Sequence, residues 1–167
     1  PNVTLVQTQS TGNSFLNIRG ISSARNSELA AAVLIDGVLL TNPTQLNQQL
    51  FDIEQIEVLR GPQGALYGRN AIGGAITITT KAPSEETEGQ IQVGYESAPG
   101  FSVKGCVGGA LNSDGSATYR LAASYIDHDG YLDNVYLNEK ADPYQDQSIR
   151  GRINWQVNDR LSTDFRA

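Results

Sequence analysis

Two different hydrophobic patterns follow one another along the chain. Up to about residue 82 the apolar residues come in short runs separated by glycine, and beyond residue 88 they alternate with polar residues over long stretches. Alternation with a period of two is typical of a β-strand with one apolar face, because successive side chains point to opposite sides. We therefore expect a small mixed unit first and a series of antiparallel strands after it.

The first part is predicted to form an α+β unit with a small mixed sheet. Apolar and β-branched runs predict strands at 15–18, 32–35, 38–40, 56–59 and 75–80. Asp36-Gly37 separates two of these runs and is typical of a tight hairpin turn.

A short amphipathic helix is also predicted in this part. Leu46, Leu50 and Ile53 are spaced by four and three residues, which places them on one face of a helix. Asn42 or Thr44 is available as the N-cap of this helix.

The second part is predicted to contain about five antiparallel strands, each with one apolar and one polar face. The apolar positions are Ile91, Val93, Tyr95, Phe101, Val103, Gly105, Val107, Gly109, Leu111, Ala117, Tyr119, Leu121, Ala123, Tyr125, Ile149, Gly151, Ile153, Trp155, Val157, Leu161, Thr163 and Phe165. The opposite positions include Gln90, Gln92, Glu96, Lys104, Thr118, Arg120, Ser124, Arg150, Arg152, Asn154, Gln156, Asp164 and Arg166. Two structures have this pattern: strands that cross a membrane, and a water-soluble sheet with one face on a core.

The connections between these strands differ in length. Residues 112–115 and 158–160 are typical of tight turns, and 97–100 form a short connection. The segment from Asp127 to Gln147 is long and acidic and contains aromatic residues, as is expected of an outer loop of a membrane barrel.

The glycine-rich centre of the first part, residues 60–76, does not match a phosphate-binding loop. No Gly-Lys-Ser/Thr occurs in the chain, and the centre lacks the G-x-G-x-x-G spacing directly after a strand. We expect these glycines to provide positive φ angles and close backbone approach in a compact turn.

Three ordered motifs in the first part resemble the plug domain of TonB-dependent outer-membrane receptors. The longest is Ile53-Glu54-Gln55-Ile56-Glu57-Val58-Leu59-Arg60-Gly61-Pro62-Gln63-Gly64-Ala65-Leu66-Tyr67-Gly68, continued by Gly73-Gly74-Ala75-Ile76 to Thr80-Lys81. Phe15-Leu16-Asn17-Ile18-Arg19-Gly20 and Val33-Leu34-Ile35-Asp36-Gly37-Val38 match two further motifs in the same order. The motif glycines are Gly20, Gly37, Gly61, Gly64, Gly68, Gly73 and Gly74.

The resemblance implies a domain organisation and a place in the cell. Residues 1–82 are expected to be an α+β plug domain with short helices, 83–88 a linker, and 89–167 the first strands of a transmembrane β-barrel. A plugged transporter barrel has 22 strands, so about five strands form an incomplete barrel. No TonB box is visible, so the chain is expected to start inside the plug. The expected location is the bacterial outer membrane, with the plug facing the periplasm.

The resemblance also implies a function and partners. Receptors of this family take up a scarce nutrient, such as a ferric siderophore, a vitamin or a glycan, with energy supplied by TonB. The implied partners are TonB, the remainder of the barrel, the nutrient and outer-membrane lipid. The alternative is a free-standing, soluble plug-like binding module without transport activity.

Two sets of site residues follow from the family's motif positions. Arg19 and Arg60, together with Glu57, match the latch that holds the plug to carboxylates of the barrel, a pairing that suits the guanidinium fork. A local ion pair with Glu57 or Glu54, or simple solvation, is the alternative for these arginines. Ligand-contacting loops match Arg25, Asn26, Ser27, Asn42 and Gln45, for which a solvated loop is the alternative.

Charge and composition argue against several other functions. The net charge is -6, and all of the excess lies beyond residue 82, where seven basic residues face thirteen acidic ones. Nucleic-acid binding is excluded because it requires clustered Lys and Arg. The chain has no long apolar run for a membrane-spanning helix and no signal-peptide pattern at its start.

Metal and catalytic sites are not predicted either. Residues 127–133 resemble only half of a calcium loop, the single His128 is expected to be a solvated loop residue, and the single Cys106 a small residue on a polar strand face. A hydrolase would need a nucleophile with an oriented base, and the G-x-S-x-G motif is absent. We expect no enzymatic activity and no cofactor.

Overall fold

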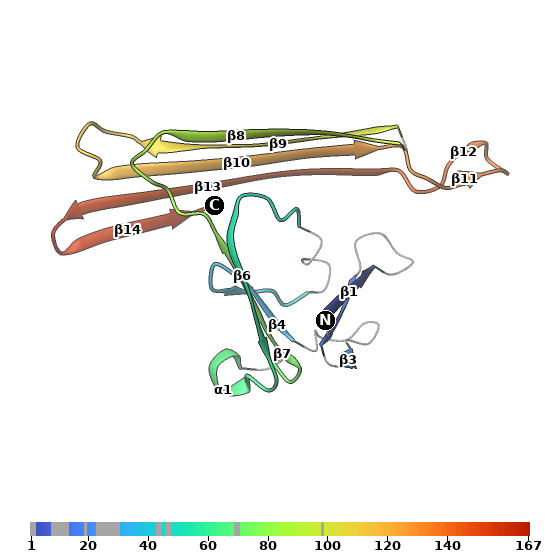
Figure 1. Ribbon diagram of the computed structural model, residues 1–167, viewed down its shortest axis with the longest axis horizontal. Coiled ribbons are helices and arrows are strands. Elements are labelled where there is room, and N and C mark those ends of the chain that lie inside the picture. Colours follow the sequence, from blue (N-terminus) through green and yellow to red (C-terminus); the bar gives the residue numbers. More distant parts are fainter. Residues whose placement is uncertain are drawn as a thin grey trace. The chain divides into compact units, whose positions relative to one another are not determined.

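The computed structural model of this chain describes residues 3–7, 14–18, 20–22, 31–42, 45, 48–68, 71–97 and 99–167. The chain divides into two compact units, Pro1–Lys81 and Ala82–Ala167. Each unit has its own sheets, which are coloured from blue to green in the first unit and from green to red in the second (Figure 1). No helix among the described residues is long and apolar enough to cross a membrane.

The first unit contains two small sheets. Strands β1 (Val3–Gln7), β2 (Ser14–Ile18) and β3 (Ile21–Ser22) form an antiparallel sheet. The second sheet has the order β5-β4-β7-β6, with β4 (Ala32–Ile35), β5 (Val38–Leu39), β6 (Ile53–Arg60) and β7 (Gly74–Thr80). Strand β4 pairs with β7 in parallel, whereas its pairing with β5 and the pairing of β6 with β7 are antiparallel. The mixed sheet predicted from the sequence is therefore present.

The core of the first unit covers both faces of β4. Val33 lies in a buried cluster with Leu16, Ile18, Ala31, Leu40 and Ile78. Its neighbour Ala32 points the other way and is buried with Ala71 and Ala75. Small alanines on the second face let the glycine-rich segment after β6 approach the sheet closely.

The predicted helix around Leu46, Leu50 and Ile53 is wrong for the residues that the structure describes. Leu50 is not helical, and Ile53 begins strand β6. Asp52 adopts a φ of 58°, which a right-handed helix does not allow, so the chain turns just before the strand. Ile53 then takes an extended conformation because it pairs with β7. Within the described part of the chain the one α-helix is the four-residue α1 (Gly64–Tyr67), so the short helices of the prediction reduce to this turn.

The second unit is an antiparallel meander. Strands β8 (Glu88–Glu96), β9 (Gly100–Ala110), β10 (Ala117–His128), β13 (Tyr144–Asn158) and β14 (Leu161–Arg166) lie in the order β14-β13-β10-β9-β8, each beside its neighbour in sequence. Figure 1 shows these long strands side by side. All five strands predicted from the alternation are present, and β8 and β14 are at the edges of the open sheet.

The outer connection is shorter and more ordered than the sequence indicates. Strand β10 continues to His128 and β13 already begins at Tyr144, so the loop covers residues 129–143. Strands β11 (Asp133–Asn134) and β12 (Glu139–Lys140) form a small hairpin inside it. His128 is a strand residue whose ring stacks on Tyr144 at 5.3 Å between centroids, so the prediction of a solvated loop histidine is wrong.

Candidate functional site

The glycine-rich motif connects β6 to β7 through a compact, backbone-bonded turn. Gly61 donates to the carbonyl of Gly73 at 3.2 Å, and Gln63 donates to the carbonyl of Ala71 at 2.8 Å. Gly74 has a φ of 150°, and a Cβ placed there would collide with the carbonyl oxygen of Leu59. The glycine at this position is therefore required by the close approach of β6 to β7.

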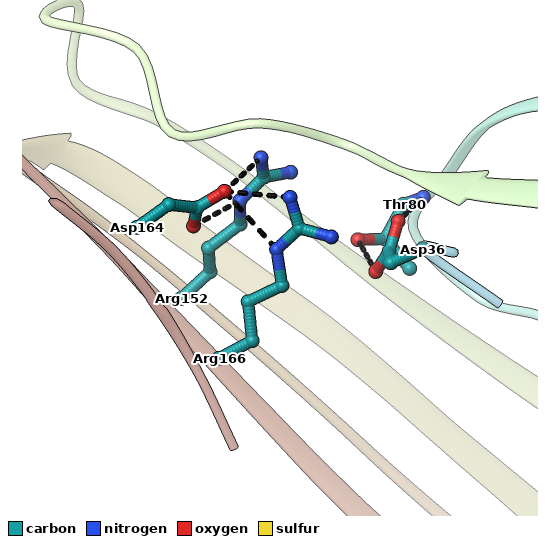
Figure 2. A network of polar contacts seen from close by, with 5 residues as sticks. All are labelled: Asp36, Thr80, Arg152, Asp164 and Arg166. Carbon is teal, nitrogen blue, oxygen red and sulfur yellow. Dashed lines mark hydrogen bonds and ion pairs between the residues drawn. The ribbon is translucent and has the colours of Figure 1, made fainter. Parts of the chain in front are cut away.

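A carboxylate clasp joins the β4–β5 hairpin turn to the end of β7. Asp36 has a φ of 49° and accepts two hydrogen bonds from Thr80, from the backbone N–H at 2.9 Å and from the hydroxyl at 2.7 Å (Figure 2). The backbone N–H of Asp36 donates in turn to the carbonyl of Ile78 at 2.9 Å. Thr80 is buried, so Asp36 satisfies polar groups that water does not reach.

Replacing Asp36 with alanine is expected to lower the free energy of unfolding of the plug unit by about 2–3 kcal/mol, because the buried donors of Thr80 lose their acceptor. Asp36→Asn is the control, since asparagine keeps an acceptor oxygen and tolerates a positive φ. Denaturant unfolding and hydrogen exchange at the Thr80 amide measure the difference. Equal losses for the two variants would show that the clasp contributes nothing.

The predicted latch residues lie partly outside the described residues. Arg19 is not described. Arg60 ends β6 and is exposed, without an ion pair among the described residues, so the alternative of a local pair with Glu54 or Glu57 is not formed. Glu57 is exposed on the same strand and accepts a hydrogen bond from the Gln55 side chain at 2.8 Å.

The predicted ligand-contacting residues are described in only one of their two loops. Arg25, Asn26 and Ser27 lie outside the described residues. Asn42 and Gln45 are exposed, and the side-chain oxygen of Gln45 accepts the backbone N–H groups of Thr41 and Asn42, both at 3.0 Å. Gln45 therefore shapes its own loop through its oxygen.

The polar face of the five-stranded sheet holds a row of charged residues that the sequence did not predict as a site. The strand register places Glu88, Gly108, Arg120, Arg152 and Arg166 side by side across β8, β9, β10, β13 and β14. The row is visible in the sequence only after the register of all five strands is known.

Arg120 connects the first and third strands of this row. Its guanidinium donates to Glu88 at 2.6 Å and lies near the Cys106 sulfur at 3.7 Å, while its side chain is only 5% exposed. Glu88 is on β8 and Arg120 on β10, so the arginine passes over Gly108 of β9. A Cβ at Gly108 would come within 2.9 Å of the Tyr119 carbonyl oxygen and 3.4 Å of Nη1 of Arg120, so glycine suits this position under the arginine.

A second network ties β13 to β14 (Figure 2). Arg152 binds both oxygens of Asp164, through Nε at 3.0 Å and Nη2 at 2.8 Å. Arg166 donates to Oδ2 of the same carboxylate through Nη2 at 2.6 Å. Such bidentate, charge-assisted bonds fix both strands on the polar face.

The opposite face of the sheet is apolar, and many of its side chains are exposed. Among its side chains, Ile91 is 74% and Ile149 73% exposed, while Thr118, Arg120 and Ser124 on the polar face are buried. This is the reverse of a soluble sheet, in which the apolar face is covered and the polar face is solvated.

Aromatic residues bound the apolar face at both ends. One row contains Tyr95 and Phe101, and the ring of Tyr125 stacks on that of Phe101 with 5.4 Å between the ring centroids. The row at the other end contains Trp155 beside Ala117. Ten residues along β10, from Ala117 to Asp127, separate these rows. At about 3.3 Å per residue and a tilt of about 40°, that separation corresponds to a band about 25 Å high.

Aliphatic residues, glycine and alanine fill the two middle rows of this band. One row contains Gly89, Val107, Leu121 and Gly151, and the next contains Ile91, Gly105, Ala123 and Ile149.

The carboxylate of Asp142 organises the outer loop, residues 129–143. Asp142 accepts the backbone N–H of Leu132 at 2.8 Å, and this hydrogen bond lowers the pKa of Asp142 below its ordinary value. Lys140 pairs with Asp133 at 2.8 Å across the hairpin, which raises the pKa of Lys140. In the described residues, no group of three or more His, Cys, Asp or Glu side chains is arranged to hold a metal ion.

The Leu132–Asp142 bond is expected to weaken only in acid. The folded pKa of Asp142 is lowered, so the stabilisation is complete above the ordinary carboxyl pKa of about 3.9 and is lost as the pH falls through the lowered value. The amide chemical shift of Leu132, followed by NMR during acid titration, is expected to report this loss. In Asp142→Asn the shift is expected to stay flat, and the same titration in both proteins would contradict the assignment.

Comparison with known proteins places these features in context. The family model described as the TonB-dependent Receptor Plug Domain matches residues 1–75. The vitamin B12 transporter BtuB of Vibrio vulnificus is 33% identical over 158 residues, covering 89% of this chain and 24% of the relative. The pesticin receptor of Yersinia pestis is 42% identical over 94 residues, covering 54% of this chain and 14% of the relative.

Solved structures with the same fold are also receptors. The crystal structure of the ferric yersiniabactin uptake receptor FyuA from Yersinia pestis matches 95% of this chain with a TM-score of 0.86 and 27% identity, over 25% of that protein. The pyoverdine outer membrane receptor FpvA of Pseudomonas aeruginosa matches the fold with a TM-score of 0.79 at 20% identity, covering 99% of this chain and 23% of that protein. The chain therefore spans about a quarter of the length of these proteins.

Proposed function

We infer that this chain belongs to the TonB-dependent receptors, and from that premise we propose that it is the plug and first barrel strands of an outer-membrane protein for energy-coupled nutrient uptake. In this proposal residues 1–82 are the plug domain, 83–88 the linker, and 89–167 the first strands of a transmembrane β-barrel. The family consists of receptors and transporters rather than enzymes.

The observation that supports a membrane location is the burial pattern of the sheet in the second unit, in which apolar side chains are exposed and polar side chains on the other face are buried. Its apolar face is exposed over a band that fits the apolar thickness of an outer-membrane barrel, and its charged row occupies the other face. A soluble plug-like module would leave the whole apolar face in water, at a cost of about 25 cal/mol for each Å² left uncovered. The membrane proposal removes that cost.

The nutrient class is proposed from the relatives. One of them is named a vitamin B12 transporter and another a ferrioxamine B receptor, so we propose a cobalamin-like or ferric siderophore ligand, with a glycan as a further option. Loop residues Arg25, Asn26, Ser27, Asn42 and Gln45 are proposed to meet this ligand. TonB, acting in the periplasm on a segment upstream of Pro1, is the proposed energy-coupling partner.

The proposed transport step requires two arrangements of the plug. Ligand has to favour one of them through differential contacts, since a ligand with equal affinity for both arrangements shifts nothing. In the resting arrangement, Arg19 and Arg60 are proposed to pair with carboxylates of the surrounding barrel, and Glu57 with its basic side chains. These pairs would hold the plug in place.

Replacing Arg60 with alanine in the complete receptor is expected to raise the leakage of large antibiotics through the outer membrane, because a latch of the plug is lost. Arg160→Ala removes an equally basic side chain from the 158–160 turn and serves as the control. Antibiotic sensitivity of cells that express each variant at equal levels measures the effect. Equal sensitivity of the two variants would contradict the latch.

Uptake by cells that lack their own receptors tests the function. The complete gene product is expected to accumulate radiolabelled vitamin B12 or one member of a panel of ferric siderophores, with saturation, and a protonophore is expected to abolish the accumulation. Cells with the same protein in the outer membrane that accumulate none of these compounds would contradict a cobalamin-like or siderophore ligand, and accumulation that is unchanged by the protonophore would contradict energy-coupled uptake.

A further inference from the structure

The segment between the two units is bound to the five-stranded sheet before β8 begins. The carbonyl of Glu85 accepts the backbone N–H of Ala110 at 3.3 Å, which extends the pairing with β9 beyond Glu88. The side chain of Glu85 lies against Gly115, where a Cβ would come within 2.9 Å of its Cδ. We call residues 85–88 the strap.

The turn under Glu85 is preformed by its own side chains. Asn112 donates to the Ser116 hydroxyl at 2.7 Å and accepts the backbone N–H of Ala117 at 2.9 Å. Asp114 accepts the backbone N–H of Ser116 at 3.1 Å, and this bond lowers the pKa of Asp114. Gly115 has a φ of 72°, so its place in the turn suits glycine.

Two further glycines make room for the rest of the strap. A Cβ at Gly109 would lie 3.0 Å from the hydroxyl oxygen of Thr87 and 3.3 Å from its Cα. Gly108 lies under the side chain of Arg120, which crosses β9 to reach Glu88 at 2.6 Å. Glu85 and Thr87 thus lie close against Gly115 and Gly109, and Glu88 is held by Arg120.

The chain is also held just before the strap. Asp36 holds Thr80, and the backbone N–H of Lys81 donates to the carbonyl of Asp52 at 3.2 Å. Between Lys81 and the strap lie Ala82, Pro83 and Ser84, and the hydroxyl of Ser84 donates to the carbonyl of Glu86 at 3.1 Å. Proline restricts the backbone of this short connection. Only these three residues therefore separate Lys81 from the strap along the chain.

We propose that the strap is a mechanical stop: when force displaces the plug, extension of the chain ends at residue 84 because residues 85–88 stay fastened to β9, β10 and the 111–116 turn. The inference rests on the proposed function, in which force reaches the plug from the periplasm. The bonds that hold the strap run perpendicular to β8, so an axial pull loads several of them together.

Single-molecule pulling of the complete receptor in a bilayer, from a handle on its N-terminal side, tests the stop. In the unaltered receptor the released contour length is expected to end at residue 84. In Gly109→Val combined with Glu88→Ala, release is expected to continue through residues 85–96 and to add about 43 Å, at about 3.6 Å per residue.

Gly105→Val is the matched control, because it changes a glycine of the same strand and face whose nearest neighbour, the carbonyl oxygen of Gln90, is 3.7 Å away. This variant is expected to keep the stop at residue 84. An unchanged stop in the double variant, or its loss in Gly105→Val, would overturn the proposal. Heat-modifiable migration in a gel shows that each barrel is folded. If the double variant fails this test, Glu88→Gln replaces it, and a rupture force equal to that of the unaltered receptor then overturns the proposal.

The stop and the proposed function fail in different ways. The pulling measurement needs no ligand and no energy source. A receptor that shows the stop without taking up any compound would contradict the proposed function and leave the stop intact. A receptor that takes up its nutrient while its chain extends past residue 84 without resistance would contradict the stop alone.

Discussion

Replacing Ile91 with arginine is expected to lower the free energy of unfolding of the complete receptor in a bilayer by about 2–4 kcal/mol, the cost of a cation near the middle of a barrel's lipid-facing surface. Ile91 lies in a middle row of the apolar face, beside Gly105 and in line with Ala123 and Ile149. Its side chain is 74% exposed, so no packed core is disturbed by the change. Denaturant unfolding in lipid vesicles measures the loss.

Gln92→Arg is the matched control for this prediction. Gln92 is the next residue of β8, is also exposed, and points to the opposite, polar face. The control is expected to change stability by less than about 0.5 kcal/mol, as exposed substitutions usually do. A soluble sheet would tolerate both arginines equally. Equal and small losses for the two variants would therefore contradict a lipid-facing β8.

Replacing Gly74 with alanine is expected to destabilise the plug unit by about 3 kcal/mol or more, because a Cβ there collides with the carbonyl oxygen of Leu59 and the two strands have to separate. Gly74 also has a φ of 150°, which alanine rarely adopts. The loss is expected to appear in the β6–β7 pairing, measured as faster amide hydrogen exchange in these two strands.

Gly64→Ala is the control from the same motif. Gly64 begins the helix α1, and a Cβ there would meet nothing within 4 Å. Alanine at this position is expected to be neutral or to stabilise by up to about 1 kcal/mol, since it favours the helix. A similar loss at Gly64 and Gly74 would show that the motif glycines are not distinguished by local packing.

The strands of the second unit were predictable because alternation is a direct consequence of strand geometry. Each side chain of β8, β9 and β10 lies on the face that its parity indicates, and Asn112–Gly115 fixes the hairpin turn between β9 and β10. The long outer segment was less predictable. Its polar residues Asp127 and Gln145 continue the strand pairing at the outer limit of the apolar band, where hydropathy no longer marks a strand.

The helix predicted around Leu46 shows where local spacing fails. A spacing of four and three residues is compatible with a helix, but Ile53 gains more by pairing in β6 with Thr80 of β7, which is distant in sequence. The positive φ of Asp52 is the local signal of this break, and no residue-type rule required it.

The contacts between distant residues were not predictable from one sequence. Asp36 and Thr80 are 44 residues apart, and Glu88 and Arg120 are 32 apart. The Asp-Gly turn indicated a hairpin but not what its carboxylate binds. Gly108 on a polar face was a usable signal, because glycine inside a strand often marks a place where another group passes closely.

Spin labels placed one at a time along residues 89–96 of the complete receptor in lipid vesicles test the central claim most directly. If β8 is a transmembrane barrel strand, the labels at Ile91, Val93 and Tyr95 are expected to be accessible to lipid-dissolved oxygen, and the label at Gln92 is expected to be shielded from it. The accessibility then alternates with a period of two. Labels that are all accessible to a water-soluble relaxation agent, with no alternation in oxygen accessibility, would contradict a membrane-spanning strand and the receptor account built on it.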